Sequence, residues 1–250
     1  MHQHTSSVTA GVAPAHLRHN YVTALITLAA LYFAMGFITC LNDTLVPFFK
    51  ESFRLSYAAS SLVQFYFFLT YALVSLPAGK IVARTGYKGG MIGGFCIVAA
   101  GAFLFYPASL WHQYALFLAA LFVLAIGIVL LQVAANPYVT FLGAPETAAA
   151  RLTLVQGAGS VGTTLAPLFG AGIILSRQDS GVAAGEVLRM PYLGIALFLV
   201  LLAFVISRLK LPVFTRETKP GSAAPASSLK SVFRFRHLRF RVLGVFAYVG

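Results

Sequence analysis

Charge is scarce in this sequence. Only 10% of the 250 residues are charged and six are acidic, whereas a soluble domain carries about 25% charged residues. Apolar residues make up 59% of the chain. This balance excludes a soluble globular domain and predicts an integral membrane protein.

Cysteine is also rare. Cys40 and Cys96 both lie inside apolar stretches, so we interpret them as small packing residues that carry no information on the redox compartment. Residues 1–20 are polar and have no apolar core, which excludes a cleavable secretory signal.

Catalytic motifs are missing as well. The sequence has no Ser-His-Asp, HExxH or phosphate-loop pattern. Four histidines (His2, His4, His16 and His19) fall in the amino-terminal tail, where no rigid element would support a metal ion. We therefore predict that the protein is not an enzyme and that it has no metal site and no cofactor.

The net charge of +12 does not indicate a nucleic-acid partner. Half of the lysines and arginines lie at or beyond Arg208, and the others are scattered between apolar stretches. Such a distribution is typical of a membrane topology signal.

Six apolar stretches are long enough to cross a bilayer as helices, which takes about 20 residues each. They are roughly Tyr21–Phe49, Tyr57–Val82, Gly89–Pro107, Tyr114–Leu142, Leu152–Leu175 and Tyr192–Arg208. A seventh begins near Leu238, and the sequence stops inside it. The expected organisation is a tail at 1–20, a six-helix bundle at 21–208, a linker at 209–237 and the start of a seventh span at 238–250.

Loop charges orient this all-α bundle. The loop after the second stretch holds Lys80, Arg84 and Lys88 without an acid, and the linker is also basic. Basic loops face the cytoplasm, which places the amino terminus, this loop and the linker inside the cell. The basic segment FRFRHLRFR before the seventh stretch is expected to fix orientation and to contact anionic lipid.

Asp43 lies inside the first apolar stretch. A charged carboxylate at mid-bilayer costs on the order of 3 kcal/mol, so such a residue is expected to face a protein interior or a wet cavity. We interpret Asp43 as a proton-coupling residue. The alternative is a structural carboxylate neutralised by hydrogen bonds from Asn42 or neighbouring helices.

Amides are the other polar groups of the predicted bundle. The candidates for substrate binding are Asn42, Gln64, Gln132, Asn136 and Gln156. Because the central parts of the spans carry no lysine or arginine, an anionic substrate is not expected. Amides both donate and accept hydrogen bonds, which suits the hydroxyls of a neutral sugar. Each amide taken alone fits equally well as a link between helices.

Pro137 follows Asn136 directly and removes a backbone donor from its helix. The resulting kink predicts either a gate beside the amides or a packing feature. Small residues at 157–162 predict a close helix approach or, in a carrier, a sliding surface.

Four segments are specific enough to suggest a family: LNDTLVPFF, SLPAGKIVARTGYK, LLQVAANPYVTFLG and TLAPLFG. They resemble the fucose permease and glucose/galactose transporter family of the major facilitator superfamily. The resemblance is close over about residues 22–176 and looser beyond. It implies a carrier of two six-span halves in the inner membrane, alternating access, and symport of a sugar with protons or, in some relatives, sodium.

The resemblance also suggests roles for individual residues. Asp43 matches the family's membrane aspartate, and Gln132 and Gln156 map to positions that face the sugar. Fucose permeases carry glutamate where this chain has Gln132, which favours the glucose/galactose branch. Ala158-Gly159-Ser160 replaces a Phe-Asn-Ser segment of the relatives, and Ala83 replaces a frequent aspartate.

These features predict the amino-terminal half of a hexose:cation symporter whose carboxy-terminal half belongs to the same polypeptide. The 250 residues alone are not expected to transport. Two alternatives stay open: a proton-coupled exporter of lipophilic cations, and a truncated membrane protein that does not transport.

Overall fold

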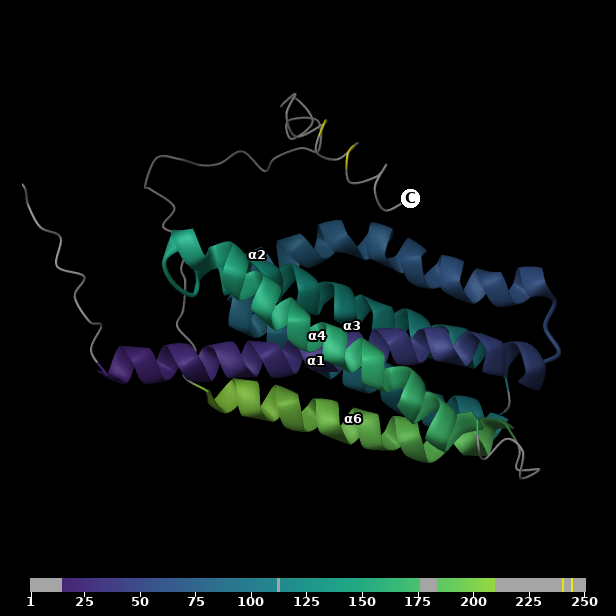
Figure 1. Cartoon of the computed structure of the whole chain (residues 1–250). Coiled ribbons are helices and arrows are strands. Elements are labelled where there is room, and N and C mark those ends of the chain that lie inside the picture. Colours follow the sequence, from purple (N-terminus) through teal and green to yellow (C-terminus); the bar gives the residue numbers. More distant parts are fainter. Residues whose placement is uncertain (1–14, 112, 176–183, 210–239, 241–243, 245–250) are drawn as a thin grey trace, which may run out of the picture. The chain divides into compact units, whose positions relative to one another are not determined.

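The computed structural model describes residues 15–111, 113–175, 184–209, 240 and 244 (Figure 1). All regular structure within these ranges is helical, which confirms the expected all-α architecture. The chain divides into two units, Met1–Phe214 and Thr215–Gly250. Most of the tail at 1–20, of the linker at 209–237 and of the seventh span at 238–250 lies outside the described residues.

The helices are long and apolar. In chain order they are α1 (Ala15–Ser52), α2 (Tyr57–Trp111), α3 (Tyr114–Phe141), η1 (Pro145–Thr147), α4 (Ala148–Phe169), η2 (Gly170–Leu175) and α6 (Ala184–Arg208). Four stretches of the described residues are long and apolar enough to cross a membrane: Tyr21–Thr44, Tyr57–Trp111, Tyr114–Phe141 and Arg189–Arg208. The predicted fifth span corresponds to α4 and η2.

The predicted second and third spans both lie within α2. Gly86 interrupts this helix with φ 75° and ψ 168°, a conformation that L-residues with a side chain rarely adopt. The basic residues Arg84 and Lys88 flank this break. The break therefore falls in the loop that the sequence analysis places between two spans.

Helix α3 packs mainly against α2, and their backbones come very close. A methyl group on Gly101 would lie 2.6 Å from the Leu124 nitrogen, and one on Gly127 would lie 2.6 Å from the Val98 nitrogen. Such contacts leave room only for hydrogen at these positions. Small residues thus fix this helix pair by close van der Waals contact, as is common in membranes.

A second close pair consists of α1 and α4 (Figure 1). A methyl group on Gly162 would lie 2.3 Å from the Phe33 carbonyl oxygen, and one on Gly36 would lie 2.3 Å from the Gly159 oxygen. This contact supports the close-approach interpretation of the small residues at 157–162. Helix α6 packs on α2 instead, where Tyr192 stacks on Phe105 at 3.9 Å between ring centroids.

Candidate functional site

A polar cavity of about 330 Å³ lies where α1, α3 and α4 meet. Its lining residues are Tyr32, Met35, Gly36, Thr39, Gln132, Asn136, Gln156, Gly159 and Thr163. Three amides and two threonine hydroxyls supply hydrogen-bonding groups, and none of these lining residues is charged. The cavity therefore offers both donors and acceptors to a neutral solute.

Helix α1 contributes one stripe of this lining. Tyr32, Gly36 and Thr39 recur at helical spacing and so share a face. Asp43 is one turn beyond Thr39 on the same face. The aspartate therefore continues the cavity stripe, although it is not part of the lining itself.

Helices α3 and α4 supply the amides. Gln132 and Asn136 are four residues apart on α3, and Gln156 lies on α4. The Tyr32 hydroxyl donates a hydrogen bond to the Asn136 side-chain oxygen, which joins α1 to α3 at the cavity wall. This bond uses the Asn136 oxygen and does not involve its amide nitrogen.

Pro137 directly follows Asn136 and is partly buried inside α3. Its carbonyl accepts a hydrogen bond of 2.7 Å from the Thr140 hydroxyl. As proline lacks an N–H, the Val133 carbonyl of the preceding turn has no i+4 backbone donor. The proline therefore interrupts the hydrogen bonding of α3 directly after the cavity residue Asn136, where the sequence analysis expects a kink.

Asp43 is exposed and bonds to the second helix of the site. The Gln64 Nε2 donates to Asp43 Oδ1 over 3.0 Å. The Tyr71 hydroxyl interacts with the Thr39 side chain and with the Asp43 carboxylate. Because Thr39 lines the cavity, Tyr71 lies between the cavity lining and the charge of the aspartate.

Asn42 occupies a different environment from the other amides. Its side chain is 1% exposed, and neither its oxygen nor its nitrogen has a hydrogen-bond partner among the described residues. The Gln64 Oε1 is buried without a partner in the same way. An unpaired buried polar group costs about 1–3 kcal/mol, so helix packing alone does not account for Asn42.

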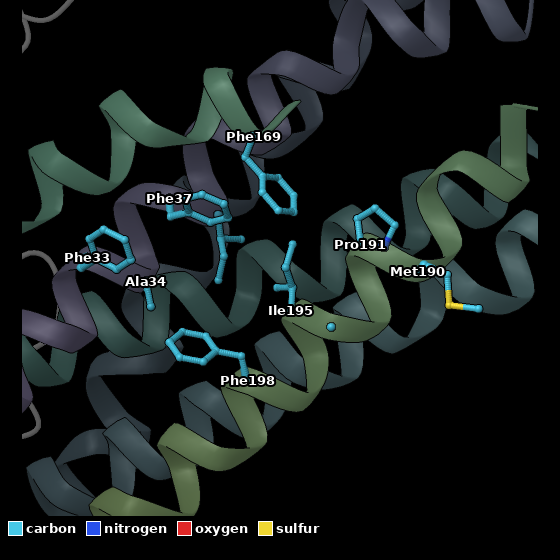
Figure 2. Close-up of a pocket in the computed structure, with 10 residues that line it drawn as sticks. Phe33, Ala34, Phe37, Phe169, Met190, Pro191, Ile195 and Phe198 are labelled. Atoms are coloured by element: carbon cyan, nitrogen blue, oxygen red, sulfur yellow. The ribbon is translucent and has the colours of Figure 1, made fainter. Parts of the chain in front are cut away.

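A second cavity, of about 440 Å³, is apolar. It lies between α1 and α6, and Figure 2 shows Phe33 and Phe37 of α1 on one side and Ile195 and Phe198 of α6 on the other. Phe169 at the end of α4 packs edge-on against Phe37 at 5.4 Å. The residues that line this cavity carry no charge and no side-chain hydrogen-bonding group.

The structure thus brings Gln132, Asn136 and Gln156 together and pairs Gln64 with Asp43, whereas Asn42 is buried away from the cavity. Sequence reasoning missed Thr39 and Thr163, because threonine is unremarkable within an apolar helix. The helical spacing from Tyr32 to Thr39 to Asp43 is the sequence signal that could have identified Thr39. Thr163 shares a similar spacing with Gln156.

Comparison with known proteins identifies the family of this chain. The model of the Major Facilitator Superfamily matches residues 24–250, which is most of the chain. The chain belongs to the major facilitator superfamily. Its members are membrane transporters, so the protein is a membrane protein and not an enzyme, as the sequence analysis predicts.

Curated relatives within this superfamily are sugar carriers. The chain is 49% identical over 233 residues to a glucose/galactose transporter of Brucella abortus, matching 92% of this chain and 56% of that protein. A putative glucose/galactose transporter of Helicobacter pylori is 44% identical over 235 residues. The L-fucose-proton symporter of Escherichia coli is 34% identical over 252 residues.

A solved structure has the same fold. The fucose transporter FucP in its outward conformation matches 92% of this chain with a TM-score of 0.75 and 34% identity, and the match covers 60% of that chain. This chain therefore spans little more than half the length of the relatives that it matches.

Proposed function

We propose that this chain forms the amino-terminal half of a cation-coupled hexose carrier of the bacterial inner membrane, working by alternating access. The relatives with 44–49% identity are named glucose/galactose transporters, which favours glucose or galactose over fucose as substrate. Because the chain spans about half of their length, we assign transport to the full-length carrier, meaning this chain together with its carboxy-terminal half.

The polar cavity is the observation that carries this proposal. Gln132, Asn136 and Gln156 line it together with two threonines and Tyr32. Vicinal sugar hydroxyls both donate and accept hydrogen bonds, as amide groups do. An aromatic face at Tyr32 would pack against the apolar side of a pyranose ring. The uncharged lining favours a neutral hexose over a sugar phosphate, which would recruit a cation.

Asp43 is the proposed coupling residue. It lies one turn from the cavity on the same face of α1, Gln64 donates a hydrogen bond to it, and its charge acts on Tyr71. In our proposal, a proton bound at this carboxylate allows the loaded carrier to reorient, because a neutral acid crosses a low-dielectric region at lower cost than an anion. Sodium is the second candidate for the coupling ion, on the basis of the family resemblance.

The proposed orientation of the chain in the membrane rests on the basic segment around Gly86. Lys80, Arg84 and Lys88 border this break in α2, and basic loops face the cytoplasm. The amino terminus is then cytoplasmic as well, since two spans separate it from this loop. Labelling of single cysteines introduced at 84 and 113 by a membrane-impermeant maleimide tests this orientation, because only position 113 should react in intact cells.

Export of a lipophilic cation is the competing function. The apolar cavity between α1 and α6 has the aromatic lining that such a substrate favours. However, no acid is among its lining residues, and a desolvated cation needs a counter-charge or a hydrogen-bonding partner. We therefore favour hexose transport.

Uptake measurements test the proposal. The full-length carrier, expressed in a bacterial strain without its own hexose uptake, is expected to accumulate labelled glucose or galactose. Unlabelled hexoses should compete and lipophilic cations should not. If a protonophore abolishes hexose accumulation in sodium-free buffer, the coupling ion is the proton. If accumulation requires sodium, the coupling ion is sodium. A carrier that accumulates no hexose, or that expels lipophilic cations, would overturn the proposed function.

A further inference from the structure

Arg151 is a buried cation that the proposed sugar site does not account for. It lies in the first turn of α4, and its side chain is only 4% exposed. A cation near a helix amino terminus opposes the helix dipole, and a buried charge without partners is costly. Its position therefore indicates that something outside α4 holds the guanidinium.

The partners of Arg151 lie at the end of α3 and in the connection from α3 to α4. Its Nη2 donates to the Thr140 oxygen at 3.0 Å, its Nε to the Val139 oxygen at 3.4 Å, and its Nη1 to the Ala144 oxygen at 3.0 Å. The Nη1 also bonds to the Thr147 hydroxyl. The last carbonyls of a helix have no intrahelical partner, and a cation there aligns favourably with the helix dipole. Arg151 is thus a cap for α3.

The end of α3 needs such a cap because of Pro137. Only the four residues from Tyr138 to Phe141 follow the proline before the helix ends. A single helical turn is unstable by itself, since nucleation fixes several residues for few hydrogen bonds. The proline also interrupts the bonding that would tie this turn to the preceding one. The guanidinium instead ties this turn to the start of α4 through the Val139 and Thr140 carbonyls.

This cap lies close to two of the helices that line the polar cavity, α3 and α4. The end of α3 follows directly on Asn136, and Arg151 precedes Gln156 on α4 by a little more than one turn. A methyl group on Gly143 would lie 3.0 Å from the Arg151 Nη1 and 3.3 Å from a ring carbon of Tyr21 in α1. The guanidinium therefore lies beside Gly143, as does the Tyr21 ring of α1, and it joins the two helices that supply Asn136 and Gln156.

We propose that Arg151 is a positioning residue of the sugar site: by clamping the turn after Pro137 to the start of α4, it holds Asn136 and Gln156 in register across the cavity. This inference rests on the proposed hexose function. The planar fork of arginine reaches carbonyls in several directions, which the single ammonium of lysine cannot match. Lysine should therefore restore the function only in part.

Transport kinetics of the full-length carrier test the role. Arg151→Met is expected to raise the hexose KM on the order of 10- to 100-fold, as expected for misplaced binding groups, with the maximal exchange rate per folded carrier within about twofold of wild type. The hexose KM of Arg151→Lys should lie between those of the wild type and Arg151→Met. Arg189→Met is the matched control, because Arg189 is a partly buried arginine that contacts Ser109 and Tyr106, which do not line the polar cavity. A KM unchanged in Arg151→Met would overturn the inference.

A double-mutant cycle separates positioning from general destabilisation. If Arg151 acts through Asn136, the variant carrying both Arg151→Met and Asn136→Ala should be no worse in KM than the more affected single variant. Independent defects would instead multiply, and that result would contradict the proposal. If Arg151→Met does not fold, Arg151→Lys enters the same cycle, with Thr147→Val as a milder loss of one partner.

A readout without sugar distinguishes this inference from the proposed function. In a background with Cys40→Ser and Cys96→Ser, a cysteine in place of Asn136 is alkylated by a water-soluble maleimide. The inference predicts that Arg151→Met changes this alkylation rate severalfold, while Arg189→Met leaves it unchanged. Equal alkylation rates in the Arg151→Met and Arg189→Met variants would refute the proposed role of Arg151. If the parent carrier transports no hexose, the proposed function fails while the alkylation assay still decides the role of Arg151.

Discussion

Gln64 on α2 donates a hydrogen bond of 3.0 Å to the Asp43 carboxylate on α1. The amide therefore holds one carboxylate oxygen, while the Asp43 side chain is exposed. In the proposed carrier, the pair links the coupling residue to a second helix of the same half. The contact motivates the first prediction.

Asp43→Asn is expected to abolish accumulation of hexose against a gradient. The amide cannot bind and release a proton, but it preserves the size of the side chain. Exchange of labelled for unlabelled hexose should therefore persist, because exchange needs no net movement of the coupling ion. Uptake and counterflow in vesicles with the full-length carrier measure the two activities, and accumulation that survives the change would remove Asp43 from the coupling role.

Asn42→Leu is expected to leave thermal stability unchanged or to raise it by about 1 kcal/mol, because the change removes two unpaired buried polar atoms. A role in transport would appear as a large loss of uptake in a well-folded protein, the usual compromise between stability and function. Thermal unfolding in detergent and hexose uptake provide the two measurements. A strongly destabilised variant would show instead that Asn42 has a structural role.

Gln132→Ala is expected to raise the hexose KM by about 3- to 10-fold, which corresponds to the loss of one or two neutral hydrogen bonds. Tyr32→Phe should have a smaller effect, since it removes only the bond that orients Asn136. Tyr106→Phe is a suitable control, because Tyr106 does not line the polar cavity. Equal KM values in the wild type and Gln132→Ala would exclude Gln132 from the sugar site.

Gly162→Ala is expected to destabilise the carrier by about 1–3 kcal/mol, because its methyl group would lie 2.3 Å from the Phe33 oxygen and must push α1 and α4 apart. Gly157→Ala on the same helix is the matched control, since no atom lies within 4 Å of its added methyl group. Comparison of their melting temperatures checks this prediction. Similar stabilities would mean that α1 and α4 separate easily, as a sliding interface requires.

Lys88→Met is expected to destabilise the carboxy-terminal end of α6 by about 0.5–1 kcal/mol. The Lys88 Nζ donates to the Ser207 oxygen at 2.9 Å and to the Leu209 oxygen at 2.8 Å, which caps that helix. Lys80→Met changes an exposed lysine of the same basic loop and controls for the loss of positive charge. Limited proteolysis near residue 209 should be faster in the first variant only.

Much of the fold follows from local patterns. The apolar stretches are long enough to span a membrane, and all six are helical, the second and third within α2 and the fifth across α4 and η2. Gln132 and Asn136 were predicted to share a face because helical spacing alone requires it. Gln64 and Asp43 were both singled out as polar residues within apolar stretches, but no local rule pairs residues on different helices.

What the sequence alone determined is which residues are polar within an apolar chain and which face of its own helix each one occupies, because composition and helical periodicity are local properties. Only the tertiary structure decided which faces meet. It set Tyr32 against Asn136, left Asn42 buried without a partner, and brought Arg151 to the carbonyls at the end of α3. These pairings depend on how closely small residues allow helices to approach and on which carbonyls a proline leaves without donors.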